Sequence, residues 1–403
     1  MPLHIVPDGT ITSPRGFAAG ATHAGLKTLG ERPLDLGILL SDTPCVVAGM
    51  FTTNVFQGAS LVLTRERVTV GSAQALIVNS GNANAGTGEQ GMHDAEEIAS
   101  LTAAKLALPV RSVLVGSTGV IGVPMPMPLV RAGIEAIQVS ANGGRSLAQA
   151  ITTTDTFPKE RAVSFMVDGH EVSVGGIAKG AGMIHPNMAT LLAFLTTDAA
   201  VEPSFLRQAL RRAVDRSLNM VTIDGDTSPD DMVVIFANGV GGNDPLNEGH
   251  PGAADFLTAL EDVCRYLAVC IARDGEGATR LLTIEVTGAQ SEEDARLAAR
   301  TIAGSMLVKS AVHGADPNWG RLIAALGRSG AHVVPEKIGL YLDTIPLVRE
   351  GRSLPFDRED ARQHMLGREV LFRLDLGLGQ GQATAWGCDL SEEYVTFNSA
   401  YTT

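Results

Sequence analysis

The residues with the clearest chemical potential lie in one segment, 179–194, with the sequence KGAGMIHPNMATLLAF. A single lysine is followed by closely spaced glycines and an uncharged stretch that contains His185 and Thr190, which indicates a tightly turned, buried backbone with a few polar groups. A threonine hydroxyl is a weak nucleophile until a base removes its proton, and a lysine amine with a pKa near 10.4 is mostly protonated. Taken alone, Thr190 is typical of a structural residue before an apolar strand, and His185 of a core or turn histidine.

Other chemical signatures are absent or weak. The chain has no GxxxxGK[ST], GxGxxG, HExxH or GxSxG motif, and no His/Cys cluster has the spacing of a zinc site. We therefore expect no cofactor and no metal. A run of aspartates in IDGDTSPDD lacks the calcium-loop pattern and is typical of a solvated or self-capping turn; its members are Asp224, Asp226, Asp230 and Asp231.

Four separated motifs, in this order, resemble one family. They are SGNANA at 80–85, GSTGVIG at 116–122, the segment 179–194, and TFNSAYTT at 396–403. The chain resembles the ornithine acetyltransferase family of arginine biosynthesis, also called glutamate N-acetyltransferase. The likeness extends from Gly16 to the last residue, essentially the whole chain.

The resemblance implies that the chain is a precursor that cleaves itself between Ala189 and Thr190. The products would be an α chain, residues 1–189, and a β chain, residues 190–403. Thr190 would then carry a free α-amine, whose pKa of about 7.7 to 8.0 suits a general base at neutral pH. The uncut chain has an amide nitrogen there, so we expect it to be inactive in acetyl transfer.

The resemblance also implies the reaction. The Thr190 hydroxyl would take acetyl from N2-acetylornithine and pass it to glutamate in a ping-pong cycle, with Thr118 and Gly119 forming the oxyanion hole. The residues that match the family's substrate contacts are Thr153, Lys179, Thr190, Glu276, Asn398 and Thr403. Some relatives also take acetyl from acetyl-CoA, and the motifs leave this co-substrate open.

Composition limits the partners. With 31 Lys and Arg against 44 Asp and Glu, the formal charge of −13 disfavours binding to nucleic acid or to an acidic membrane surface. The four cysteines form no CxxC pair, and the N-terminus lacks the basic and apolar regions of a signal peptide. We therefore expect a cytoplasmic protein.

The elements that must position these residues alternate between strands and helices. Short apolar runs punctuated by glycine and threonine predict strands in the first 130 residues, including ASLVLT at 59–64. The prolines at 124, 126 and 128 predict an extended connection. Acidic residues in the first turn predict a helix over 93–106, and apolar stripes at helical spacing predict helices over 202–219 and 253–272.

This mixture predicts an α/β fold, a layered sandwich of sheets and helices with N-terminal-nucleophile-type chemistry. We expect a catalytic core over 1–280 and a smaller C-terminal α/β domain over 281–403 that ends in a substrate-contacting tail. The family suggests that the α and β chains stay associated as an α2β2 assembly.

Two other interpretations remain open. The same apparatus could transfer the acyl group to water, which would make the protein an amidase or aminopeptidase. Alternatively, the segment around Thr190 could be only a buried strand in a non-catalytic binding protein, which predicts one intact polypeptide.

Overall fold

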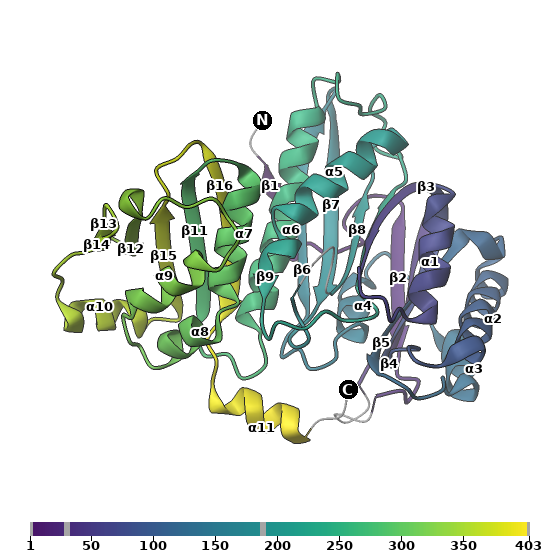
Figure 1. Ribbon diagram of the computed structural model, residues 1–403. Coiled ribbons are helices and arrows are strands. Elements are labelled where there is room, and N and C mark those ends of the chain that lie inside the picture. The colour runs from purple at the N-terminus through teal and green to yellow at the C-terminus, as the bar shows by residue number, and fades with distance from the viewer. Residues whose placement is uncertain (1–2, 28–32, 186–190, 401–403) are drawn as a thin grey trace.

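The computed structural model describes residues 3–27, 33–185 and 191–400. Its elements form two sheets with helices packed on their faces, which confirms the predicted α/β class (Figure 1). The predicted residues Ala189, Thr190 and Thr403 lie outside the described residues.

The larger sheet has nine strands in the order β1-β6-β7-β8-β10-β3-β4-β5, with β2 paired to β3. Strands β7, β8 and β10 lie in the middle of this order. Strand β8 is antiparallel to β7 and parallel to β10. The bounds are β1 His4–Ile5, β2 Phe17–Thr22, β3 Leu36–Phe51, β4 Ser72–Asn82, β5 Val113–Val120, β6 Lys159–Val167, β7 His170–Lys179, β8 Leu192–Thr197 and β10 Met232–Ala237.

The smaller sheet has seven strands in the order β14-β13-β12-β15-β11-β16-β9. Its edge strand β9 comes from residues before 280, so the first part of the chain also contributes to this sheet. The boundary near residue 280 stays a prediction. The bounds are β9 Val221–Thr222, β11 Leu281–Ala289, β12 Gly339–Leu342, β13 Ile345–Arg349, β14 Arg352–Ser353, β15 Glu369–Asp375 and β16 Gly381–Cys388.

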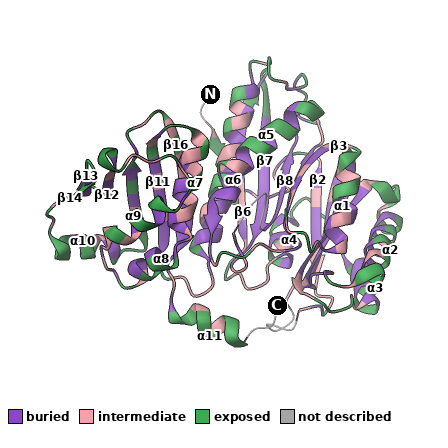
Figure 2. Ribbon diagram, in the orientation of Figure 1, coloured by how far each residue is buried: buried purple, intermediate pink, exposed green. Residues whose placement is uncertain are grey.

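The helices cover both sheets and bury three apolar clusters (Figure 2). The largest cluster joins α5 and α6 to both sheets, while α2 and α3 cover the end of the larger sheet near β4 and β5. No helix in the described parts of the chain is long and apolar enough to span a membrane. The bounds are α1 Ala59–Thr69, α2 Gly88–Leu106, α3 Met127–Ala136, α4 Gly144–Ala150, α5 Pro203–Asp215, α6 Ala253–Arg273, α7 Glu292–Ala303, α8 Met306–His313, α9 Trp319–Gly327, α10 Arg358–Met365 and α11 Glu392–Ala400.

Two local predictions were wrong. The run 59–64 is the start of helix α1 and not a strand, because its packing against β5 overrides the β propensity of its residues. Pro128 lies in the first turn of α3, where a proline is tolerated because the first helical N–H groups have no partner within the helix.

The four cysteines provide a test of this packing. All are buried and free, and burial raises the pKa of Cys45 and of Cys264 to about 12. Because the thiolate is the reactive form, we expect the native protein to be inert to a thiol reagent at neutral pH. The denatured protein should react at all four residues. Fast labelling of the native protein would contradict the buried positions.

Candidate active site

A cavity of about 240 Å³ gathers the predicted site residues that the structure describes. Its wall comes from the ends of β5 and β7, the start of β8, the loop before β10, the loop after α6, and helix α11. Six predicted residues line it together: Thr118, Gly119, Thr153, Lys179, Glu276 and Asn398. A larger groove of about 990 Å³ between α6 and the smaller sheet contains none of them.

Thr118 and Gly119 lie at the end of β5, where the strand pairs with β4. Gly119 has a φ of +132°, and a Cβ at this position would overlap the backbone of Gly81. Only glycine allows the two strands to approach so closely. The hydroxyl of Thr118 accepts a hydrogen bond from Lys179 Nζ at 3.4 Å, which leaves its own proton free to donate into the cavity.

Lys179 is the last residue of β7 and is only 8% exposed. It pairs with Leu192, the first residue of β8. Lys179 therefore lies at the end of the central strands where β8 begins. Lys27 lies near the positive charge of Lys179. Burial lowers the pKa of Lys27 to about 8, and repulsion by the Lys179 ammonium adds to this effect.

Lys159 joins three segments of the cavity wall. Its ammonium is fully buried and contacts Asp155 Oδ1 and Asp274 Oδ2, each at 2.5 Å. Asp155 also accepts hydrogen bonds from the backbone N–H of Thr153 at 3.0 Å and of Gly180 at 2.8 Å. The segment 153–155 after α4, the end of β7 and the end of α6 are thereby tied to one buried cation.

The same contacts explain the charge state of Asp155. Burial raises the pKa of this carboxyl, but the charges of Lys159 and Lys179 and the N–H of Gly180 outweigh burial and hold the pKa below its ordinary value. Asp155 is therefore ionised and can accept all of these hydrogen bonds at neutral pH.

Glu276 lies against the loop that leads from β7 toward the predicted cleavage site. Its N–H donates to the carbonyl of Ala181 at 2.8 Å, and a Cβ on Gly182 would overlap its carboxyl group. Asn398 Nδ2 donates to Glu276 Oε2 at 2.8 Å. The loop is also held by Asp224, which accepts from the N–H groups of Met183 at 2.5 Å and Ile184 at 2.9 Å.

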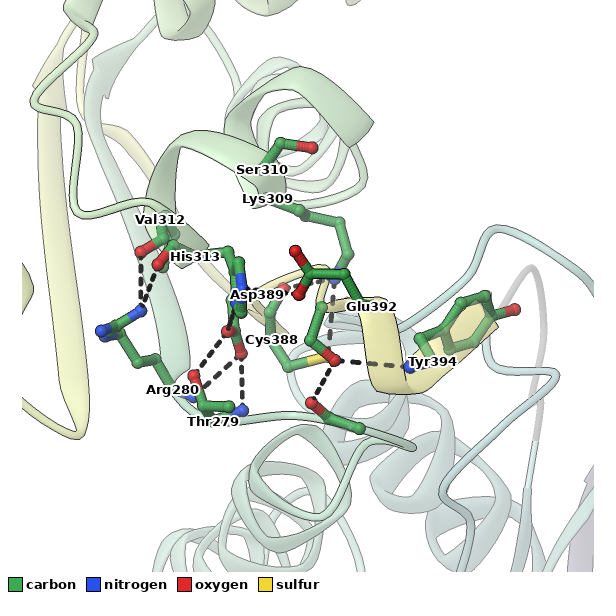
Figure 3. A network of polar contacts seen from close by, with 12 residues as sticks. Thr279, Arg280, Lys309, Ser310, Val312, His313, Cys388, Asp389, Glu392 and Tyr394 are labelled. Atoms are coloured by element: carbon green, nitrogen blue, oxygen red, sulfur yellow. Dashed lines mark hydrogen bonds and ion pairs between the residues drawn. The ribbon is translucent and has the colours of Figure 1, made fainter. Parts of the chain in front are cut away.

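The start of α11 is anchored by Asp389 (Figure 3). Its carboxylate accepts from the N–H and hydroxyl of Thr279 and from the N–H of Arg280, at 2.6 to 2.9 Å, and contacts His313 Nδ1 at 2.8 Å. This network fixes the chain at the base of α11. The helix can then bring Asn398 to Glu276.

The sequence pattern missed two residues of the wall. Asp230 and Asp231 were expected in a solvated or self-capping turn, but each is only 4% exposed and both line the cavity. The self-capping expectation holds for Asp224, which accepts from the N–H of Asp226 at 3.3 Å. One sequence signal could have found the buried pair: it directly precedes MVVIFA, the fully buried strand β10.

His185 does not line the cavity. Its Nδ1 lies 2.9 Å from the Thr222 hydroxyl, and burial, reinforced by the charge of Arg300, lowers its pKa. This position fits the expected core or turn histidine.

A mixed α/β core whose cavity gathers a hydroxyl, a glycine amide and a lysine suits an acyltransferase. The ArgJ family profile matches residues 18–403. The chain is 49% identical to the arginine biosynthesis bifunctional protein ArgJ of Dehalococcoides mccartyi over 401 residues, which cover 100% of this chain and 99% of that protein. It is 50% identical to the protein of the same name from Symbiobacterium thermophilum over 397 residues, or 98% of this chain and 99% of that protein.

Among solved structures, the arginine biosynthesis bifunctional protein argJ of Bacillus halodurans matches with a TM-score of 0.51 and 42% identity. The match covers 52% of this chain and 98% of the solved chain. The present chain belongs to the ArgJ family and is an acyltransferase of arginine biosynthesis. The resemblance found from the four motifs is confirmed.

The Lys159 contacts lead to a stability prediction. Replacement of Lys159 by Met leaves two buried carboxylates without their cation, so we expect a loss of about 3 to 5 kcal/mol in the free energy of unfolding, measured by denaturant titration. Arg145 is the matched control, because its side chain is largely exposed and its contact with Glu160 spans 3.9 Å. Arg145→Met should cost less than about 1 kcal/mol, and equal losses for the two variants would contradict the structural importance of Lys159.

Proposed function

We propose that this enzyme transfers acetyl from N2-acetylornithine to glutamate through an acetyl-Thr190 intermediate, and that it also accepts acetyl from acetyl-CoA. The observation that carries the proposal is the cavity itself. It combines Thr118, Gly119 and Lys179 at the end of the sheet where β8 begins. The first residue of β8, Leu192, follows the proposed nucleophile by two positions.

Self-cleavage between Ala189 and Thr190 would supply the base. Thr190 then has its hydroxyl and its α-amine on one residue, and the amine has a pKa close to neutral pH. The half-length of the solved Bacillus halodurans chain supports a two-chain product, since that chain is matched almost entirely by about half of this one.

In the first half-reaction, the Thr190 oxygen attacks the acetyl carbonyl while the α-amine takes the hydroxyl proton. The Thr118 hydroxyl and the Gly119 N–H donate to the oxyanion, a contribution typically worth about 100-fold or more in rate for each donor. Ornithine leaves, and the α-amine of glutamate then attacks the acetyl ester. No cofactor and no metal take part in this scheme.

Charge on the cavity wall supports an amino-acid substrate. Lys179 offers a cation for the α-carboxylate that both substrates carry, while Glu276, oriented by Asn398, offers an anion for an amine or a side-chain ammonium. Thr153 completes the described part of the contact set. We infer that Thr403 contributes from the C-terminal tail.

The sheet supports a stable association of the two chains after cleavage. Strands β8 and β10 of the proposed β chain hydrogen-bond to β7 and β3 of the proposed α chain, in the middle of the larger sheet. Lys159 and Asp274 would form an ion pair between the chains. Separation would break these bonds, so the chains should stay together. We further propose, from the family resemblance, that they assemble as α2β2 in the cytoplasm.

Intact-mass measurement under denaturing conditions tests the cleavage. We expect two fragments, one of which begins Thr190-Leu191-Leu192, because the cut must create the base. Thr190→Ala should remain one chain, since it lacks the hydroxyl that attacks the scissile bond. A wild-type chain that stays intact after long incubation at neutral pH would refute the mechanism and favour the binding-protein interpretation.

Product analysis tests the acceptor and the donor. With N2-acetylornithine and glutamate we expect N-acetylglutamate and ornithine in equal amounts, and with acetyl-CoA and glutamate we expect N-acetylglutamate and free CoA. Acetate released from N2-acetylornithine without glutamate, as fast as transfer with it, would identify an amidase instead. Absence of product from acetyl-CoA would restrict the enzyme to recycling.

A further inference from the structure

Asp230 and Asp231 are buried carboxyl groups that the proposed transfer scheme does not use. They follow one another in the loop before β10 and both line the cavity that contains Thr118 and Lys179. Among the described residues, Asp230 Oδ1 and Asp231 Oδ2 are buried without a hydrogen-bond partner. A buried, unpartnered carboxylate oxygen is costly, so such atoms call for an explanation.

The backbone is shaped to hold these groups. A Cβ on Gly58 would overlap the Asp230 carboxyl, so the glycine allows this carboxyl to lie against the start of α1. Gly58 N–H donates to the carbonyl of Pro229 at 3.2 Å, which fixes the loop there. Met232, the residue after Asp231, donates its N–H to the carbonyl of Leu191 at 2.9 Å. This hydrogen bond connects the aspartate pair to the start of the proposed β chain.

Burial and the mutual repulsion of the two carboxylates disfavour the state in which both are ionised. The charged side chains on the same cavity wall are Lys179 on β7, Asp224 and Asp226 in the same loop, and Glu276 after α6, while the first turn of α1 has no acidic residue. Burial and the charge of Asp231 raise the pKa of Asp230 well above its ordinary value, although the charge of Lys179 opposes this rise. Burial raises the pKa of Asp231 well above its ordinary value too, although Lys179 and hydrogen bonds from Ser228 oppose this rise. The hydrogen bonds from Ser228 favour the charged form of Asp231, so we assign Asp230 as the protonated member of the pair.

The reaction needs such a proton. The amide nitrogen of N2-acetylornithine carries one hydrogen and leaves as an ammonium with three, whereas the Thr190 hydroxyl supplies only one of the two additional protons. Conversely, the ammonium of glutamate loses two protons when it becomes an amide, and the Thr190 oxygen takes back only one. One proton is thus consumed in the first half-reaction and released in the second.

We propose that the Asp230–Asp231 pair stores this proton. In the first half-reaction the C–N bond breaks and the Asp230 O–H donates its proton to the departing ornithine amine. In the second, the Asp230 carboxylate removes one proton from the glutamate ammonium, which frees the nitrogen lone pair to attack the acetyl ester. The Thr190 α-amine moves the other proton in both directions. This inference rests on the proposed transfer mechanism.

The test compares two acceptors on the preformed acetyl-enzyme. Asp230→Asn keeps the size of the side chain but removes its acidic proton. We expect transfer to glutamate to slow by about 100-fold or more at neutral pH, the usual contribution of a general base, and to recover as rising pH deprotonates free glutamate. Hydroxylamine is already an uncharged amine at neutral pH, so its reaction should match that of the wild type. The control Asp42→Asn removes an exposed carboxylate that does not line the cavity and should create no such pH dependence.

Asp231→Asn provides a second variant with the opposite signature. Without the neighbouring negative charge, Asp230 loses its proton at lower pH. We therefore expect acetyl-enzyme formation from N2-acetylornithine to be slower than in the wild type at neutral pH. The ratio of the two rates should approach one as the pH falls, because the donor is again protonated there while the α-amine base is affected equally in both enzymes.

Each outcome separates the interpretations. Transfer to glutamate by Asp230→Asn at the wild-type rate over the whole pH range would overturn the proton-storage proposal. An equal loss with glutamate and hydroxylamine would also overturn it, since that result indicates a structural role. A wild-type enzyme that forms no acetyl-enzyme would refute the transfer mechanism itself, and the inference with it.

Discussion

The buried ammonium of Lys159 is the interaction on which the arrangement of the cavity depends. It lies between Asp155 and Asp274, and those two carboxylates in turn accept hydrogen bonds from the backbone N–H groups of Thr153, Thr156 and Gly180. A buried ion pair is seldom the most stabilising way to fill a core. Here it serves a geometric purpose, because one cation fixes the relative positions of segments that are far apart in the sequence.

The cavity itself is unusually rich in carboxyl groups for a site with a single lysine. Asp224, Asp226, Asp230, Asp231 and Glu276 share its wall with Lys179. These acids have different environments. Asp224 accepts hydrogen bonds from backbone N–H groups, and Glu276 is oriented by Asn398. Asp230 and Asp231 each have a buried oxygen without a hydrogen-bond partner. In the proposed mechanism, backbone support, substrate recognition and proton storage would fall to different members of one acidic group.

Much of the fold could be predicted from periodicity alone. Helices α5 and α6 begin where their apolar stripes predict, at Pro203 and Ala253, because each buries a face against the larger sheet. The run at 59–64 could not be assigned in this way. Its apolar and β-branched residues suit a strand or a helix equally, and only the neighbouring β5 decides between them.

The candidate site shows the same division. The motifs and the family resemblance that they carry pointed to Thr118, Lys179, Glu276 and Asn398, and these residues do converge on one cavity. The burial of Asp230 and Asp231 could not be predicted, because an aspartate in a polar loop is usually solvated. Their environment depends on Gly58 and on the parallel pairing of β10 with β8, which are tertiary features.

In the larger sheet, strands from both sides of the proposed cut lie next to one another, and this arrangement affects how the protein can refold. Before the proposed cut, β7 and β8 belong to one chain, and the sheet can form in a folding reaction whose rate does not depend on protein concentration. After the cut, unfolding releases two separate chains, and recovery requires them to meet and to reinsert β8 and β10 between β7 and β3. Refolding then becomes bimolecular, and the durability of the mature enzyme is governed by how slowly it unfolds.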